Sequence, residues 1–268
     1  MAEKIFNEFK RNLTKGLPVA LATIIEGPGQ GAKLLLLPDG SYLGSLGNEK
    51  INNVLSRDMA GELAAGRTSI RHYGIEGEAR EETLSIFIES FAPPPQMVIF
   101  GAVDFTAALV RIAKVLGYKV IVCDARPVFA TTARFPQADA VENEWPDQLM
   151  EKLGASLGPR DAVCVLTHDN KFDVPAITSA LQTQVGYIGV MGSRKTHDNR
   201  TERLIEAGVT TKEFERVMSP IGLDLGARTP EETAISICAE IIAMRTGRKA
   251  PHLKTIAVSY THLTLPTI

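Results

Sequence analysis

The sequence has little of what would assign a protein to a binding class at once. Its 29 Lys and Arg residues nearly balance 31 Asp and Glu residues, giving a net charge of −2, so no bulk field attracts nucleic acid or an anionic membrane. No basic cluster is interleaved with aromatic residues, as a nucleic-acid surface would require. No apolar run approaches the ~20 residues of a membrane span, and residues 1–16 lack the apolar core of a secretory signal. We therefore expect a cytoplasmic protein with neither a nucleic-acid nor a membrane partner.

Cysteine is scarce as well. The three cysteines, Cys123, Cys164 and Cys238, lie far apart and are odd in number, so they suggest neither a disulfide framework nor a metal site with close ligand spacing. Cys123 and Cys164 fall within apolar stretches that read as strands, and free cysteine is among the residues most often buried. We expect three buried thiols and no metal site.

The composition is globular, with 44% hydrophobic and 22% charged residues, and the length suits one large or two modest domains. Residues 1–90 are expected to form a small α+β domain. Its helices are predicted at 3–15 and 48–65, and its strands at 19–25, 33–37, 42–46, 68–73 and 84–90. Residues 91–96 contain three consecutive prolines, which cannot continue a helix or a central strand, so we place a linker there.

Apolar strands and helices alternate after the linker. Strands are predicted at 97–101, 118–124, 161–167 and 185–192, and helices at 104–116, 174–183 and 229–245. Because the strands are apolar almost throughout, helices should cover both faces of their sheet. Residues 97–248 are therefore predicted to be α/β, a Rossmann-like doubly wound parallel sheet preceded by the smaller α+β domain. Thr229, Pro230 and Glu232 predict a capping box at the start of the last helix.

The last stretch, residues 249–268, matches no element of this fold. SYTHLTLPTI follows a polar linker, so we expect a disordered or foreign tail, with an edge strand as the alternative.

The turn after the first strand of the Rossmann-like domain departs from the dinucleotide-binding pattern. Gly101 allows a tight bend, but Val103 stands where backbone would have to approach a pyrophosphate. Asp104 adds a negative charge at the helix start, or serves as the N-cap. Asp124 closes the second strand, where a ribose-binding acid would lie, and Arg126 follows it. Tight binding of NAD or NADP in the usual pose is disfavoured, while Gly101, Asp124 and Arg126 remain candidate cofactor-binding residues.

Two further polar stretches follow apolar strands, and ligands of open α/β sheets bind beyond the carboxyl ends of the strands. His168 and Asp169 follow residues 161–167, and His168 can carry a proton near neutral pH; a loop histidine bonded to backbone is the alternative. The other stretch comprises Gly192, Ser193, Arg194, Lys195 and His197. Free N–H groups at a helix start and two cations predict a phosphate cradle there, with a solvated helix start as the alternative.

A loop punctuated by glycine, residues 219–228, precedes the last helix and carries few charges. Its Asp224 and Arg228 either pair with each other and fix the loop, or line the ligand cleft.

These stretches together resemble one family. LTHDNKFD, GYIGVMGSRKTH and SPIGLDLGARTPEETAISICAEI, in this order, closely resemble the XdhC/CoxI accessory proteins of molybdenum hydroxylases, and the resemblance covers about residues 15–246. It implies an N-terminal XdhC/CoxI domain and a C-terminal Rossmann domain. It also implies a function, because such proteins bind the molybdenum cofactor, favour its sulfuration and help to insert it into xanthine dehydrogenase-type enzymes.

The resemblance further implies a ligand and partners. The ligand would be the molybdenum cofactor, molybdopterin or its dinucleotide form, with its phosphate on residues 193–195. Lys33, in a segment similar to a G-A-[RK] motif of the family, would meet this ligand from the N-terminal domain; a surface lysine is the alternative. The partners would be a molybdenum hydroxylase client and a sulfurtransferase, and a homodimer is left open. A cofactor chaperone is expected rather than a turnover enzyme.

The chain departs from the family pattern at one further point. Many relatives carry a G-G-C-x-E segment, whereas residues 44–50 read GSLGNEK here, which makes thiol ligation of molybdenum at this place impossible. Two other functions therefore stay open: an NAD(P)-dependent oxidoreductase, and a regulatory or scaffold protein that has lost its ligand.

Overall fold

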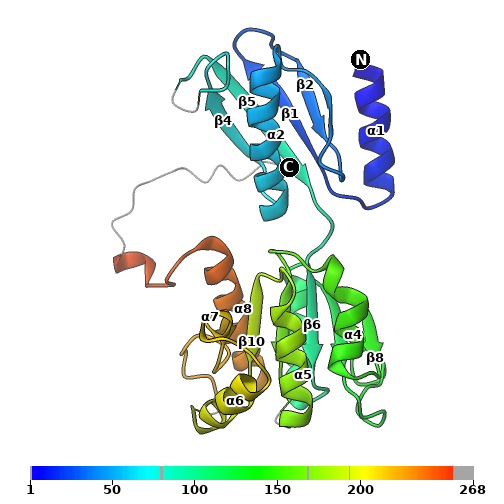
Figure 1. Ribbon diagram of the computed structural model, residues 1–268, viewed down its shortest axis with the longest axis vertical. Coiled ribbons are helices and arrows are strands. Elements are labelled where there is room, and N and C mark those ends of the chain that lie inside the picture. Colours follow the sequence, from blue (N-terminus) through cyan, green and yellow to red (C-terminus); the bar gives the residue numbers. More distant parts are fainter. Residues whose placement is uncertain (1, 79–80, 168, 193, 256–268) are drawn as a thin grey trace.

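The structure is a computed structural model that describes residues 2–78, 81–167, 169–192 and 194–255; the side chains of residues 194–199 lie outside this part. Two units lie one above the other along the long axis of the molecule (Figure 1). The first unit contains an antiparallel sheet and the second a parallel one. The predicted fold class, an α+β unit followed by a Rossmann-like unit, is confirmed.

The N-terminal unit is built on five antiparallel strands in the order β3-β2-β1-β5-β4. Its elements are α1 (Ala2–Thr14), β1 (Val19–Glu26), β2 (Lys33–Leu36), β3 (Tyr42–Gly44), α2 (Glu49–Ala65), β4 (Ser69–Tyr73) and β5 (Leu84–Phe91). The fully buried Ile51 and Leu55 hold α2 against one face of the sheet. Asn48 caps the start of α2 by accepting a hydrogen bond from the Ile51 N–H, and Gly66 ends it in the left-handed conformation.

The C-terminal unit contains six parallel strands in the order β11-β10-β9-β6-β7-β8. They are β6 (Gln96–Phe100), β7 (Lys119–Cys123), β8 (Ala140–Glu142), β9 (Ala162–Val165), β10 (Tyr187–Val190) and β11 (Val217–Met218). The chain starts in the middle at β6, moves outward to β8, and returns to β9 on the other side of β6. This is the Rossmann strand order, and the carboxyl ends of β6 and β9 form its topological switch point.

Helices cover both faces of the parallel sheet, as its apolar strands predicted. They are α3 (Asp104–Val115), α4 (Pro146–Leu153), α5 (Asn170–Leu181), α6 (Arg194–Glu206), α7 (Thr211–Phe214) and α8 (Pro230–Thr246), with short 3₁₀ turns at η1 (Gly154–Ser156) and η2 (Leu253–Thr255). α3 and α8 pack together on one face, and α4 and α5 on the other. In the part of the chain that the structure describes, no helix is long and apolar enough to cross a bilayer.

Several elements differ from the sequence prediction. α5 begins at Asn170 rather than at residue 174, because the Asp169 side chain caps it by accepting from the Lys171 N–H, and Pro175 is accommodated inside the helix. β8, α4 and β11 were not predicted. β8 and β11 contain three and two residues, and strands this short show no detectable alternation of burial.

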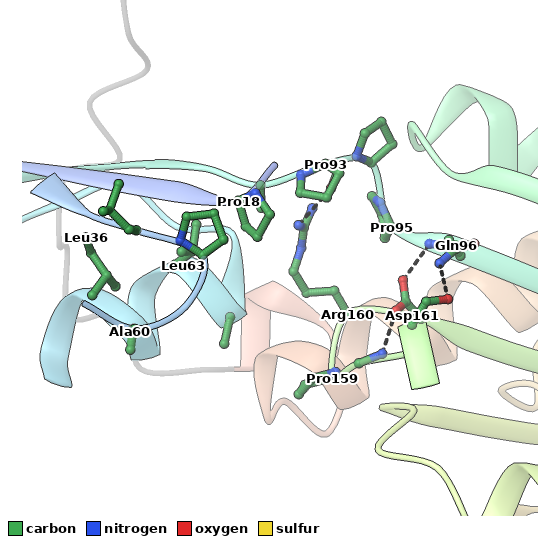
Figure 2. Close-up of a pocket in the computed structure, with 18 residues that line it drawn as sticks. Pro18, Leu36, Ala60, Leu63, Pro93, Pro95, Gln96, Pro159, Arg160 and Asp161 are labelled. Atoms are coloured by element: carbon green, nitrogen blue, oxygen red, sulfur yellow. Dashed lines mark hydrogen bonds between the residues drawn. The ribbon is translucent and has the colours of Figure 1, made fainter. Parts of the chain in front are cut away.

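The two units meet at the amino ends of the parallel strands. The linker enters β6 at Gln96, whose backbone N–H donates to the Asp161 carboxylate at 2.5 Å, just before β9. A groove of about 350 Å³ lies here, lined by Leu36 and Leu63 of the first unit and by Arg160 of the second (Figure 2). The carboxyl ends of the strands therefore point away from the N-terminal unit (Figure 1).

Residues 249–255 are exposed and include η2. Residues 256–268 lie outside the described part, so the nature of the C-terminal tail stays a prediction.

Candidate functional site

The carboxyl edge of the parallel sheet gathers five of the predicted site residues. Gly101 follows β6, Asp124 and Arg126 follow β7, Asp169 follows β9, and Gly192 follows β10. Their placement at one edge agrees with the expected position of a ligand site in this fold.

Part of the predicted phosphate cradle cannot be placed. His168 and Ser193 lie outside the described residues, as do the side chains of Arg194, Lys195 and His197. The backbone of residues 194–206 forms α6, which begins directly after the β10 loop. The phosphate cradle therefore has its predicted helix start, and its side-chain contacts remain a prediction.

Gly101 makes the bend at the switch point. Its φ is +110°, and a Cβ there would lie 2.9 Å from the backbone nitrogen of Thr167, so only glycine fits. The helix that follows has Val103 as its N-cap, with no side-chain cap bond. The prediction that Asp104 caps this helix is therefore wrong. Asp104 lies in the first turn, where its carboxylate complements the helix dipole and approaches Arg134 at 3.8 Å.

The Asp124 carboxylate is the most heavily bonded group of this edge. It accepts from the Ala102 N–H (2.8 Å), the Arg126 N–H (3.0 Å), Arg126 Nε (2.9 Å) and Arg126 Nη2 (2.8 Å). Burial raises the pKa of Asp124, but the bonds from Arg126 and Ala102 outweigh it and hold the pKa below 3.8. Both oxygens are thus already engaged, and no acceptor position is left for the hydroxyl groups of a ribose.

A buried ion pair lies beneath the edge and was missed from the sequence. Arg200 of α6 is fully buried, and its Nη2 donates to Asp173 Oδ2 and to the Met191 carbonyl, both at 2.9 Å. Thr167 donates to the other oxygen of Asp173. Arg200 Nε has no hydrogen-bond partner among the described residues. One signal in the sequence could have pointed to it. Arg200 and the buried Leu204 lie four residues apart, so they share the buried face of α6.

Arg200 thereby connects α5 with two of the loops at the edge. Its Nη1 lies 3.4 Å from the hydroxyl of Ser219, which follows β11. One guanidinium group therefore holds α5 and the loops after β10 and β11 together.

The loop at residues 219–228 is anchored at its start and its end. Glu240 of α8 accepts from the Gly222 N–H at 2.9 Å and from the Tyr187 hydroxyl at 2.5 Å. The predicted capping box of Thr229 and Glu232 is confirmed. Asp224 and Arg228 are both exposed, and within the described part of the chain no ion pair joins them. Of the two roles predicted for Asp224 and Arg228, pairing with each other is not seen among the residues that the structure describes. Lining the ligand cleft stays a prediction.

Lys33 lies apart from these residues. It begins β2, is exposed, and its Nζ donates to the Thr23 hydroxyl at 2.8 Å. Because the N-terminal unit faces the amino ends of the parallel strands, one chain does not bring Lys33 to the carboxyl edge (Figure 1).

Three aromatic side chains at the same edge were also missed from the sequence. Phe129 follows β7, Trp145 precedes α4 and Phe172 lies in the first turn of α5. Cationic side chains lie over their rings, Arg126 over Phe129 and Lys171 over Trp145. No clear signal in the sequence pointed to this cluster, because the three rings lie far apart in the sequence and β8, the strand before Trp145, was not predicted.

The three cysteines are buried and free, as predicted. Burial raises the pKa of Cys123 to about 12 and that of Cys238 to about 11, and it raises the pKa of the buried Cys164 well above its ordinary value. Such thiols stay protonated and are poor metal ligands. Among residues 2–78, 81–167, 169–192 and 194–255, no group of three or more His, Cys, Asp or Glu side chains could hold a metal ion.

Two family models match the chain. The XdhC Rossmann domain matches residues 97–241, and the XdhC and CoxI family matches residues 13–74.

Individual proteins are similar to parts of the chain. A probable xanthine dehydrogenase subunit of Bacillus subtilis is 36% identical over 165 residues, which are 62% of this chain and 47% of that protein. The molybdenum cofactor insertion chaperone PaoD of Escherichia coli is 25% identical over 162 residues, 60% of this chain and 44% of that protein. The chain thus spans about half the length of these curated relatives.

A solved structure shares the fold. A xanthine dehydrogenase from Bacillus halodurans superimposes with a TM-score of 0.54 at 22% identity, covering 92% of this chain and 96% of that one.

Proposed function

Because the chain belongs to the XdhC and CoxI family, we propose that it is an accessory protein that binds the molybdenum cofactor and assists its insertion into a xanthine dehydrogenase-type molybdenum hydroxylase. The observation that carries this proposal is the similarity to the cofactor insertion chaperone PaoD over 162 residues. The similarity to a protein named as part of a xanthine dehydrogenase supports the class of client enzyme.

The chemistry of the carboxyl edge supports this ligand. The molybdenum cofactor combines a planar pterin with an anionic phosphate, and its dinucleotide form adds a base. The edge offers exposed aromatic rings and the cations Arg126, Lys171 and Arg228. Because the three thiols are buried, the protein would hold the cofactor through its organic part and phosphate rather than through a cysteine–molybdenum bond.

The oxidoreductase alternative is less well supported. An NAD-binding Rossmann domain uses the acid at the end of its second strand to bind the ribose hydroxyls. In this chain that acid, Asp124, accepts four hydrogen bonds from Arg126 and Ala102. Titration with NADH and NADPH is therefore expected to show no tight binding.

The test of the proposal is purification from cells that make the molybdenum cofactor. We expect molybdenum and a pterin to co-purify with the protein in similar molar amounts, and the loaded protein to activate a client enzyme prepared without its cofactor. Purification from cells that lack cofactor biosynthesis is the matched control. Protein that carries neither molybdenum nor pterin, and fails to activate the client, contradicts the proposal.

Sulfuration of the bound cofactor is a finer part of the same proposal. We expect a sulfurtransferase supplied with a persulfide donor to raise the sulfurated fraction of cofactor on the protein. Activity of the client after transfer, with and without cyanide treatment to remove the sulfur, measures that fraction.

A further inference from the structure

Phe129, Trp145 and Phe172 form a connected aromatic cluster at the carboxyl edge. The rings of Trp145 and Phe172 lie 5.1 Å apart between centroids, with 44° between their planes. The Arg126 guanidinium lies 4.5 Å from the centroid of Phe129 and 5.9 Å from that of Phe172. The guanidinium therefore bridges the first ring to the other two.

The cluster is open to solvent at the place where this fold binds ligands. Phe129 is 39% exposed and Trp145 is 36% exposed, although large aromatic rings usually bury most of their surface. The three rings come from the segments that follow β7, β8 and β9, which lie beside the switch point. Two exposed rings, with the half-buried Phe172 beside them, come from three separate segments of the chain, as the lining of a ligand site commonly does.

The cations around the rings differ in how firmly they are held. Arg134, 5.5 Å from the Phe129 centroid, donates to the Ala102 carbonyl at 3.0 Å. Arg126 is held by the Asp124 carboxylate, with Asp169 also nearby. Lys171 has no carboxylate partner among the described residues, and its ammonium lies 4.9 Å from the Trp145 ring centroid and 5.9 Å from that of Phe172. An exposed contact between an ammonium and a ring is weak. A ring of a ligand can therefore displace this ammonium from the indole at little cost.

We infer that Phe129, Trp145 and Phe172 form the surface on which the planar heteroaromatic ring of a phosphate-bearing ligand stacks, a pterin or a purine nucleotide. On binding, Lys171 moves from the face of Trp145 to the anionic group of the ligand, and Arg126 stays in place beside Phe129. This inference rests on the proposed function, since it names the residues that hold the organic part of the cofactor.

Trp145 is the one tryptophan of the chain, so its fluorescence reports on this surface alone. We expect saturable quenching of Trp145 by a pterin monophosphate or by GMP, and none by inorganic phosphate. Comparison of the two ligands separates a pterin site from a purine site. Absence of quenching by both would overturn the inference.

Variants test the individual rings. Removal of one stacked aromatic ring should weaken binding about 5- to 150-fold, so we expect Phe172→Leu and Phe129→Leu each to weaken it at least about fivefold in the same titration. Trp145→Phe should retain most of the affinity, measured by calorimetry. Phe6→Ala, at a phenylalanine of α1 that is 61% exposed, is the matched control. Melting temperatures close to that of the wild type show that the variants are folded.

The role of Lys171 has its own test. Lys171→Met should weaken binding of GMP more than binding of guanosine, because only the nucleotide carries the phosphate. Equal losses for both ligands would contradict the movement of Lys171 to the anion. Lys4→Met, at an exposed lysine of α1, is the control.

Failure of this inference is distinguishable from failure of the proposed function. If wild type, Phe129→Leu and Phe172→Leu purify with equal amounts of molybdenum and pterin, the cofactor binds elsewhere and the stacking surface is wrong. If the wild type carries no cofactor, the proposed function fails, while quenching by GMP still reports on the surface.

Discussion

At the scale of single residues, polar side chains at the carboxyl edge of the parallel sheet already form hydrogen bonds within the protein. Asp124 is the clearest case, because the position alone predicted a ribose contact and the structure shows its carboxylate bonded to Arg126 and Ala102. Sequence position could predict where this acid lies. It could not predict that the guanidinium group of Arg126, two residues later, donates to both oxygens of this carboxylate. That pairing depends on the local backbone geometry.

The bonds of Asp124 make stability depend on pH in a defined direction. The pKa of this carboxyl in the folded state lies below its ordinary value of 3.8. Its contribution to the free energy of unfolding is therefore complete above about pH 4 and is lost as the pH falls through the folded-state pKa. Asp124→Asn places amide donors against the donors of Arg126, and we expect a loss of about 1.5–3 kcal/mol at pH 7.

Urea denaturation from pH 7 down to pH 3 measures this loss. The difference between wild type and Asp124→Asn should stay constant above pH 5 and shrink below about pH 4. Asp224→Asn, at an exposed carboxylate of the loop before α8, is the control and should change little. A difference that persists undiminished in acid would show that the effect is steric rather than electrostatic.

At the scale of elements, the order of strands and helices could be predicted, and the short edge strands could not. Burial on both faces leaves apolar runs such as residues 120–123, which an analysis of sequence periodicity detects. β11 has two residues and relies on pairing with β10, so its sequence alone carries no signal. The start of α5 was misplaced because Asn170, Lys171 and Asp173 are polar residues that read as loop, although Asp173 is buried against Arg200.

The buried Arg200 joins several elements of the Rossmann-like unit. It connects α6 to Asp173 of α5 and to the loops after β10 and β11. Replacing a buried ion-pair partner leaves a charge in a medium of low polarity. We therefore expect Arg200→Met to lower the free energy of unfolding by about 3–5 kcal/mol.

The measurement is urea denaturation of Arg200→Met beside Arg203→Met. Arg203 lies in the same helix and is exposed, so its replacement should change stability by less than about 0.5 kcal/mol. Equal stabilities of the two variants would mean that the buried pair contributes nothing beyond its desolvation cost.

At the scale of the whole molecule, two units could be predicted from the change in pattern at the prolines, and their arrangement could not. The amino ends of the parallel strands face the N-terminal unit, so the carboxyl edge is free to meet another protein (Figure 1). Under the proposed function, this edge would present the bound ligand to the client. The arrangement also leaves Lys33, at the start of β2, away from this edge (Figure 1).

The junction between the units is held partly by Arg160, which extends from the Rossmann unit to the linker (Figure 2). Its Nη1 donates to the Pro93 carbonyl at 3.0 Å, and the side chain is among those that line the apolar groove between the units. Interfaces of this kind inside one chain permit relative motion unless they are large and apolar. A single hydrogen bond contributes about 0.5–1.5 kcal/mol, enough to shift a population of orientations without unfolding either unit.

We expect Arg160→Ala to increase the radius of gyration in small-angle scattering, while the melting temperature changes little and Arg248→Ala has no effect. An unchanged scattering profile would show that the prolines and the apolar contacts of the groove fix the orientation by themselves.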